Sequence, residues 1–366
     1  MSIAPYTIQD WLFDRAQGRF DLDLAESGVQ FQLLRDLPLD PDWDLDYSLD
    51  RGTRELRERI AALYEDPGES NAASPPDRRD VVVTHGAQEA LYLLYRSALA
   101  AGDHVITTAP GWQQAWEVPA HIGCEVSVLD WQPGTPFDAE ALAAAVRPQT
   151  RMLILNSPCN PSGRALSDTE WDGILRVAEA HDLLVVNDEE YLLDFGASVV
   201  RRHPRSVSVS GLSKVYGMPA LRVGWARGPQ DVIERMVNYK RYTTVSNSVV
   251  WERVATRVLA DRQRHVDRYR SLVSPGLEQL TAFAKAHDAH VELVPPHGTP
   301  FAWLRFTSVP VSSQDFAEQL LDRHRTLVMP AEVFGAEHGI RISYARPADV
   351  LAEGLRRIAE QLAASV

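Results

Sequence analysis

Short apolar runs of strand length alternate with helical patterns between residues 81 and 228, and this alternation constrains the fold more than any other feature. Parallel strands need long crossover connections, so such repeats are typical of a mainly parallel sheet with helices on both faces. The sequence therefore predicts an α/β fold with a large sheet of seven strands. The expected strands are 81–84, 104–107, 125–129, 151–155, 183–186, 206–209 and 223–226.

The pattern changes after a long charged helix, which is expected around residues 261–270. Three further strands and a final amphipathic helix predict a smaller α+β domain. These elements are expected at 291–294, 301–306, 340–344 and, for the helix, 347–364. Residues 67–80 are rich in Gly, Ser, Asn, Pro and Asp and are expected to form an exposed loop.

The chain carries 50 acidic and 37 basic residues, a net charge of −13 over 366 residues. This charge argues against nucleic acid or an anionic membrane as a partner. We find neither a signal-peptide pattern nor a run of ~20 apolar residues, so a cytoplasmic protein without a membrane segment is expected. Two cysteines, Cys124 and Cys159, are too few for a disulfide scaffold, and no metal site is predicted.

A lysine, Lys214, ends a loop of small residues that includes Ser210 and Ser213, and Arg222 follows it by eight positions. Small residues let a bulky cofactor approach the backbone, and a lysine in such a loop can form a Schiff base with it. The hydroxyls and the guanidinium supply donors for a phosphate. Together these residues indicate pyridoxal 5'-phosphate (PLP) as the cofactor.

Three further motifs follow predicted strands. Asn160 begins an Asn-Pro-Ser-Gly turn, Asp188 and Tyr191 follow the strand at 183–186, and Gly86-Ala87-Gln88 opens a helix. The carboxyl ends of parallel strands are where an open α/β sheet binds its ligands. The backbone N–H groups at a helix N-terminus suit a phosphate. All four motifs are therefore expected to meet at one site.

In this order the motifs resemble the class I and II aminotransferases, which are PLP-dependent enzymes of fold type I. The resemblance covers nearly the whole chain, from Tyr47 through Trp112 to Arg341. It implies a large PLP-binding domain at 46–270 and a small domain formed by 1–45 and 271–366. It also implies a homodimer that acts on a small amino acid, with active sites at the subunit interface.

The resemblance implies a role for each matching residue. Lys214, Asp188 and Tyr191 are the expected catalytic residues: Lys214 forms the Schiff base and moves protons, Asp188 pairs with the pyridine nitrogen, and Tyr191 and Asn160 bind the phenolic oxygen. Trp112 is expected over the ring face and Arg341 on the substrate carboxylate. Gln88 is also expected to bind the cofactor, and the residues expected at the phosphate are Gly86, Ala87, Ser210, Ser213, Arg222 and, from a second subunit, Tyr47.

The chain departs from this pattern at one position. Many members of the family carry Ser or Thr three residues before the lysine as a phosphate ligand, whereas this chain has Gly211. Ser210 and Ser213 are the neighbouring hydroxyls that can take over this role.

The reaction is less constrained, because one PLP scaffold supports many reactions. The stretches Asp10-Trp11-Leu12 and Ser27-Gly28-Val29 are similar to those of the capreomycidine synthases. That resemblance implies a lyase that dehydrates and cyclises a hydroxylated L-arginine in antibiotic biosynthesis. Gly28 and Glu26 are then expected at the substrate, and Glu26, Glu189 or Glu190 is the acidic residue expected to orient the guanidinium.

Three other interpretations stay open. An aminotransferase for a basic or aromatic amino acid would use the same residues. A related lyase would accept an additional hydroxyl or one at Cγ. A non-enzymatic PLP-binding regulator would carry an N-terminal DNA-binding module, but fewer than 50 residues precede Tyr47 and they show no basic helix-turn-helix pattern.

Overall fold

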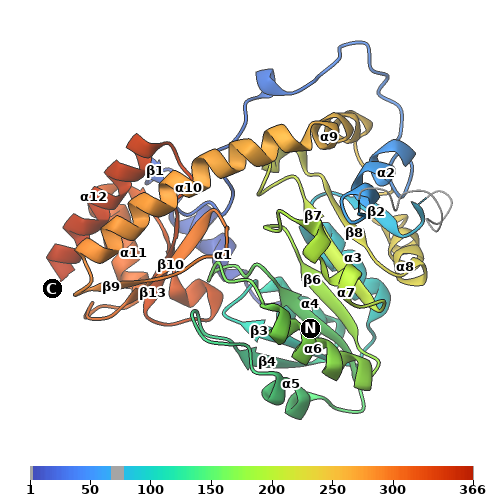
Figure 1. Cartoon of the computed structure of the whole chain (residues 1–366), viewed down its shortest axis with the longest axis horizontal. Coiled ribbons are helices and arrows are strands. Elements are labelled where there is room, and N and C mark those ends of the chain that lie inside the picture. The colour runs from blue at the N-terminus through green and yellow to red at the C-terminus, as the bar shows by residue number, and fades with distance from the viewer. Residues whose placement is uncertain (1–2, 67–77, 366) are drawn as a thin grey trace.

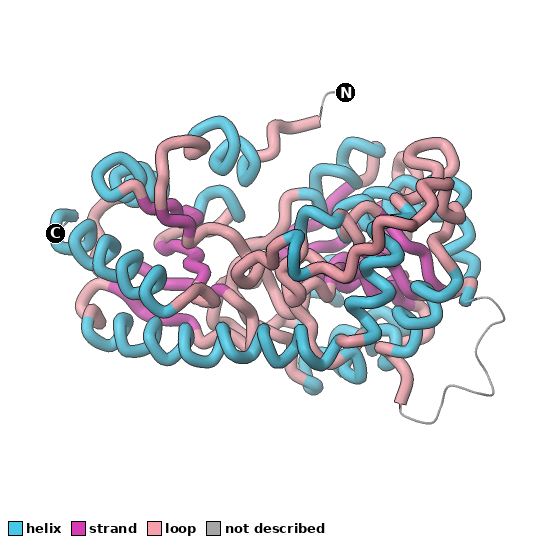
Figure 2. The backbone as a smooth tube through the Cα atoms, turned by 90° about the horizontal axis from the view of Figure 1, so that it is seen from above, coloured by secondary structure: helices cyan, strands magenta, loops and turns pink. Residues whose placement is uncertain are grey.

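The computed structural model describes residues 3–66 and 78–365. Most of the exposed loop expected at 67–80 lies outside these residues. Two groups of strands, separated by loops, form the two parts of the molecule (Figures 1 and 2). Within the described residues, no helix combines the length and the apolar character needed to cross a membrane.

The larger part is built on a seven-stranded sheet in the order β2-β8-β7-β6-β5-β3-β4. Its neighbouring strands are parallel except for β8, which runs antiparallel to both β2 and β7. The predicted fold class, α/β with a large and mainly parallel sheet, is therefore confirmed. The strands are β2 (Val81–Thr84), β3 (His104–Ala109), β4 (Glu125–Asp130), β5 (Thr150–Asn156), β6 (Leu184–Asp188), β7 (Ser206–Gly211) and β8 (Gly224–Arg227).

Both faces of this sheet are covered, which explains why its central strands are continuous apolar runs. Leu184 and Val186 of β6 pack with α3 (Ala87–Ala98), α4 (Gln114–Ile122) and α8 (Gln230–Lys240). Val185, between them, faces the opposite side and packs with α5 (Ala139–Ala145) and α6 (Asp168–Ala180). The shorter α7 (Val199–Arg202) follows on that second side, and α2 (Arg54–Ala62) packs against α9 (Val249–Ala260).

The smaller part holds an antiparallel sheet in the order β12-β13-β10-β9. Its strands are β9 (Val291–Val294), β10 (Phe301–Phe306), β12 (Met329–Pro330) and β13 (Gly339–Ser343), and its helices are α11 (Ser313–His324) and α12 (Ala348–Ser365). The long helix α10 (Arg262–Ala286) connects the two parts (Figure 1). The expected domain boundary at residue 270 falls inside this continuous helix, so the division at that residue stays a prediction.

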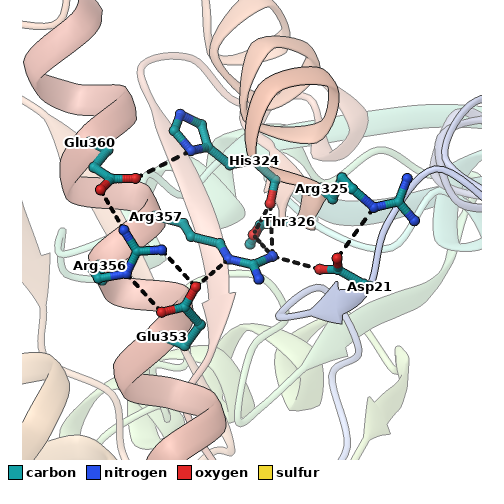
Figure 3. A network of polar contacts seen from close by, with 8 residues as sticks. All are labelled: Asp21, His324, Arg325, Thr326, Glu353, Arg356, Arg357 and Glu360. Atoms are coloured by element: carbon teal, nitrogen blue, oxygen red, sulfur yellow. Dashed lines mark hydrogen bonds and ion pairs between the residues drawn. The ribbon is translucent and has the colours of Figure 1, made fainter.

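The N-terminal segment packs against the C-terminal part of the chain. Its strand β1 (Leu22–Asp23) pairs in parallel with β11 (Thr326–Leu327). Its first helical turns, α1 (Thr7–Gln9) and the π-helical Asp10–Arg15, are anchored by Trp11, whose buried indole Nε1 donates to the Val328 carbonyl at 2.9 Å. Figure 3 shows a polar network that ties Asp21 to Arg357 on α12 and to Arg325.

Candidate active site

A cavity of about 390 Å³ opens at the carboxyl ends of the central parallel strands. Asn156 ends β5 and Asp188 ends β6, and both lie on its wall. The N-terminal helical turns and β13 complete the enclosure. The cavity is lined by Tyr6, Ile8, Gln9, Leu12, Phe13, Ala25, Glu26, Ser27, Ala87, Gln88, Leu91, Trp112, Asn156, Asn160, Asp188, Glu190, Tyr191, Ser213, Lys214, Pro219, Arg222 and Arg341.

Lys214 and Glu26 form an ion pair inside this cavity. The Lys214 Nζ donates to Glu26 Oε1 at 3.0 Å, and the same oxygen accepts the Gly28 N–H at 2.9 Å. Burial disfavours the charge on Glu26, but the lysine ammonium and these hydrogen bonds outweigh it and lower the Glu26 pKa to about 2. Burial likewise disfavours the charged lysine, but Glu26 and neighbouring acids raise the Lys214 pKa above its ordinary value. Both groups are therefore charged at neutral pH.

Asp188 presents a carboxyl group to the cavity beside this pair. The Glu190 backbone N–H donates to its Oδ1 at 3.1 Å, which fixes the orientation of the carboxyl. Burial raises the pKa of Asp188 to about 6, with a smaller contribution from the charge of Glu189. Asp188 forms no ion pair among the described residues, so a protonated ring nitrogen would offset the free-energy cost of burying its negative charge.

The N-terminus of α3 forms one end of the cavity. Gly86 precedes the helix with φ of 80°, and a Cβ atom on it would collide with the Arg222 guanidinium. Arg222 Nη2 donates to the His85 carbonyl at 3.2 Å, which holds the guanidinium beside the first free N–H groups of the helix. Ser213 adds a hydroxyl to the same cavity. Helix N–H groups, a guanidinium and a hydroxyl form an anion-binding site.

Aromatic side chains wall the cavity between its two ends. The Trp112 Nε1 donates to Gln88 Oε1 at 2.9 Å, and its ring meets that of Tyr6 edge to face at a centroid distance of 5.7 Å. Tyr191, which follows β6, packs edge to face on Phe301 at a centroid distance of 4.9 Å, and burial raises the pKa of its hydroxyl to about 12. The Tyr191 hydroxyl is thus a neutral donor at physiological pH.

Arg341, on β13, projects into the opposite end of the cavity. Its Nη1 donates to Asn160 Oδ1 at 2.6 Å and its Nη2 to the Ala25 carbonyl, while Nε has no partner among the described residues. The guanidinium lies 5.1 Å from the ring centroids of Phe301 and Phe334. Burial lowers its pKa, although an arginine stays charged. Such a buried cation with an unused donor suits a carboxylate.

Four of the residues expected at the substrate or the cofactor do not line the cavity. The Ser210 hydroxyl donates to the Glu189 carbonyl, the Gly28 N–H donates to Glu26, and Gly86 packs against the Arg222 guanidinium. Tyr47 is 86% exposed on the surface of the chain.

The alternative acid Glu189 is also absent from the cavity wall. Its carboxylate accepts hydrogen bonds from Ser198, Ser208, the Val199 N–H and Asn187, so it has a structural role in the interior. Glu26 and Glu190 remain as the carboxyl groups, besides Asp188, that reach the cavity among the described residues.

Sequence reasoning did not identify the side chains that the N-terminal helical turns bring to the cavity. Tyr6, Gln9, Leu12 and Phe13 line it, although they precede the first cofactor motif by more than 70 residues. They are placed by long-range contacts: the Thr7 N–H and hydroxyl both donate to Gln113 Oε1. The similarity to known proteins around Trp11 was the available signal for these residues. It indicated a family but did not indicate that their side chains reach the cavity.

These groups fit PLP. The lysine ammonium suits the aldehyde of PLP, and the Asp188 carboxyl suits its pyridine nitrogen. The indole suits the flat ring, the neutral tyrosine suits the phenolic oxygen, and the anion site at the helix N-terminus suits the phosphate. The glycine at the start of α3 leaves room for the Arg222 guanidinium, which belongs to the anion site.

Comparisons with known proteins agree with this chemistry. The sequence profile of "Aminotransferase class I and II" matches residues 45–358. The chain is 31% identical to a capreomycidine synthase of Streptomyces vinaceus, over 97% of this chain and 93% of the relative. It is 32% identical to the arginine–pyruvate transaminase AruH of Pseudomonas aeruginosa, over 84% of this chain and 80% of that protein.

Solved structures show the same fold. The PLP-dependent cyclase OrfR superposes with a TM-score of 0.89 at 27% identity, covering 100% of this chain and 99% of the other. A PLP-dependent aminotransferase from Streptococcus suis superposes with a TM-score of 0.91 at 24% identity, covering 100% and 99%. The smaller sheet, the parallel sheet and the cavity between them are therefore those of a PLP enzyme, and the chain belongs to the aminotransferase class I and II family.

Proposed function

We propose that this enzyme dehydrates and cyclises a hydroxylated L-arginine to a capreomycidine-type cyclic guanidino amino acid in antibiotic biosynthesis. Two observations support the proposal: the near full-length similarity to a capreomycidine synthase and the structural similarity to a PLP-dependent cyclase. The observation within the cavity that carries it is Glu26, an ionised carboxylate whose cationic partner is the Lys214 ammonium.

Glu26 can exchange that partner for a substrate guanidinium. PLP would supply an electron-withdrawing ring that makes the proton on the substrate's Cα acidic. While Lys214 itself holds the cofactor, this lysine no longer offers its ammonium to Glu26. A buried carboxylate without a cation is costly, so the site then favours a ligand with a positive group at this point. A folded arginine side chain brings its guanidinium there.

The remaining residues take matching roles in the proposal. Arg341 holds the substrate carboxylate, and Asp188 holds the proton on the pyridine nitrogen. Lys214, as a free amine, takes the Cα proton and passes a proton to the β-hydroxyl, which leaves as water. A guanidine nitrogen then bonds to Cβ and gives up its N–H proton to Lys214, which returns a proton to Cα. Substrate and product differ by one water, and the α-amino group is retained.

Ring closure within one molecule is favoured when the nucleophile is already oriented. Well-oriented intramolecular reactions gain ~7–11 kcal/mol over bimolecular ones. Glu26 belongs to the N-terminal segment, and Arg341 donates to the carbonyl of the preceding residue, Ala25. A substrate held by both is bent back on itself, which brings its two ends together.

Transamination of a basic or aromatic amino acid is the second candidate. The similarity to an arginine–pyruvate transaminase favours it, and its carboxylate-binding and proton-moving residues would be the same. The two reactions differ in the cofactor: transamination leaves it in the amine form until a keto acid arrives, whereas dehydration returns the aldehyde form at each turnover.

The test follows the cofactor spectrum with 3-hydroxy-L-arginine and no keto acid. We expect many turnovers per active site with the visible absorption of the aldehyde form retained. Conversion of one equivalent, with pyridoxamine phosphate accumulating until pyruvate or 2-oxoglutarate is added, would reject the cyclase in favour of the aminotransferase.

We also propose that the chain acts as a homodimer, as expected from its family. Large apolar side chains are exposed along the segment of residues 31–49 and on the loop that follows α8. They are Phe31, Leu33, Leu34, Leu39, Leu45, Tyr47 and Leu49, together with Tyr242 and Val245. Large exposed apolar side chains are typical of an interface, and Tyr47 belongs to this segment. The cytoplasmic location stays a prediction.

A further inference from the structure

Glu190 is a buried carboxylic acid with an unsatisfied oxygen. Its side chain lines the cavity, the residue is 7% exposed, and its Oε1 atom has no hydrogen-bond partner among the described residues. Buried polar atoms normally have partners, and leaving one without is costly. A ligand in the cavity is the natural partner, since the protein side of this oxygen offers none.

The position of the carboxyl group is set by a glycine. A Cβ atom on Gly211, at the end of β7, would lie 2.5 Å from Glu190 Oε1. The Glu190 carboxyl therefore occupies the space that a side chain at 211 would need. This is the position, three residues before Lys214, at which the chain departs from the family pattern of Ser or Thr.

Close contacts connect this point to the anion site at the start of α3. A Cβ on Gly211 would lie 3.2 Å from the Cα of Gly224, and one on Gly224 would lie 2.5 Å from the Ala87 backbone nitrogen. The Arg222 guanidinium lies against Gly86, next to Ala87. The unsatisfied carboxyl oxygen thus lies at the phosphate end of the cavity.

Four charged groups face Glu190: Asp188, Lys214, Arg222 and Glu26. Burial and the negative charge of Asp188 raise the pKa of Glu190 to about 7, against the opposing effect of Lys214 and Arg222. A phosphate would oppose ionisation further. A neutral carboxylic acid carries one O–H donor, and phosphate oxygens are strong acceptors.

We propose that Glu190, as the neutral acid, donates a hydrogen bond to the phosphate of PLP in the space left by Gly211. This role rests on the cofactor and is independent of which reaction the enzyme catalyses.

The test measures PLP binding to the cofactor-free protein between pH 6 and pH 9, through quenching of tryptophan fluorescence, since Trp112 lines the same cavity. Glu190→Gln keeps a donor of the same shape at every pH. We expect the native protein and this variant to bind PLP equally at pH 6. At pH 9 the native protein should bind about tenfold more weakly than the variant, because a one-unit rise in the pKa of Glu190 on binding corresponds to a factor of ten. Glu190→Ala should bind about 3–10-fold more weakly than the native protein at pH 6.

Pyridoxal, which lacks the phosphate, is the matched control ligand. Its affinity ratio between the native protein and Glu190→Gln should not change with pH. A ratio for PLP that is constant from pH 6 to pH 9, or the same pH-dependent ratio for pyridoxal, would overturn the proposal. A cooperative thermal unfolding transition of each variant is the control for folding. A native protein that binds no PLP would show that PLP is not its cofactor and would overturn the proposal as well.

Discussion

At the scale of single residues, the chemistry of the site depends on charges that burial has made expensive. Asp188, Glu26 and Lys214 line the same cavity. Burial raises the pKa of Asp188, whereas the opposite charges of Glu26 and Lys214 outweigh the effect of burial on each other's pKa. Asp188 and Lys214 could be predicted because each follows a strand in a recognisable motif. The Glu26–Lys214 pair could not, because its two members are 188 positions apart and no local pattern links them.

Glu26→Gln should weaken the binding of a guanidinium substrate. A charge-assisted hydrogen bond contributes about 1.5–3 kcal/mol, so we expect KM for 3-hydroxy-L-arginine to rise about 10–100-fold. PLP content should not change. A hydroxylated amino acid without a guanidine group is the control, and steady-state kinetics on both substrates separates the effect on the guanidinium from any effect on Lys214. An equal penalty for the two substrates would remove Glu26 from the guanidinium site.

Asp188→Asn should lose activity and gain stability. The pKa of Asp188 is about 6 in the folded chain against an ordinary value of 3.8, so the folded state binds its proton more tightly. Its contribution to stability is present below pH 4 and is lost as the pH rises through 6. Without this buried charge, the cofactor-free variant should be more stable by about 3 kcal/mol at pH 8 and show little difference at pH 4. Urea unfolding at the two pH values measures this.

At the scale of elements, the sequence could predict the strands but not the place of the N-terminal segment in the cavity. The parallel strands were expected within a few residues of their observed bounds, because apolar runs flanked by turns are local signals. The helix α10 is longer than the charged stretch at 261–270 that predicted it. Residues 6–13 and 23–28 reach the cavity only through contacts with distant parts of the chain, such as the pairing of β1 with β11.

Arg346 holds the loop that carries Glu26. Its guanidinium donates to the carbonyls of Asp23, Glu26 and Gly28 at 3.3, 3.1 and 2.9 Å. Arg346→Met would leave these buried carbonyls without donors, and we expect a loss of about 2–4 kcal/mol in the free energy of unfolding, with a raised KM.

Arg356→Met on α12 is the matched control for this change. Arg356 belongs to the network of Figure 3, but its ion pairs with Glu353 and Glu360 are on the surface. Exposed ion pairs contribute little, so the melting temperature and KM of this variant should stay near those of the native enzyme. Equal effects of the two substitutions would contradict the role of Arg346 in positioning the loop.

At the scale of the whole molecule, the two sheets and the cavity between them are completed by segments from both ends of the chain. The family resemblance predicted this arrangement, whereas composition and periodicity predicted only the fold class. The exposed apolar side chains of residues 31–49 had no signal in the sequence, because their exposure depends on the folded surface.

Leu45→Glu with Leu49→Glu should convert the proposed dimer into a monomer. The two side chains are 81% and 56% exposed beside Tyr47, so a charge on each would be buried at the interface. Sedimentation should show half the native mass, with loss of PLP retention. Val128→Glu, on β4 and 46% exposed outside this surface, is the control that should leave the mass unchanged. A native protein that sediments as an active monomer would contradict the dimer.

The most direct test of the cyclase is the mass of the product formed from 3-hydroxy-L-arginine labelled with ¹⁵N at the α-amino group, in heavy water and without a keto acid. The account predicts a cyclic guanidino acid that has lost one water, retains the ¹⁵N label and carries deuterium at Cα, where Lys214 returns a proton. A keto acid product with the label transferred to the cofactor would contradict it.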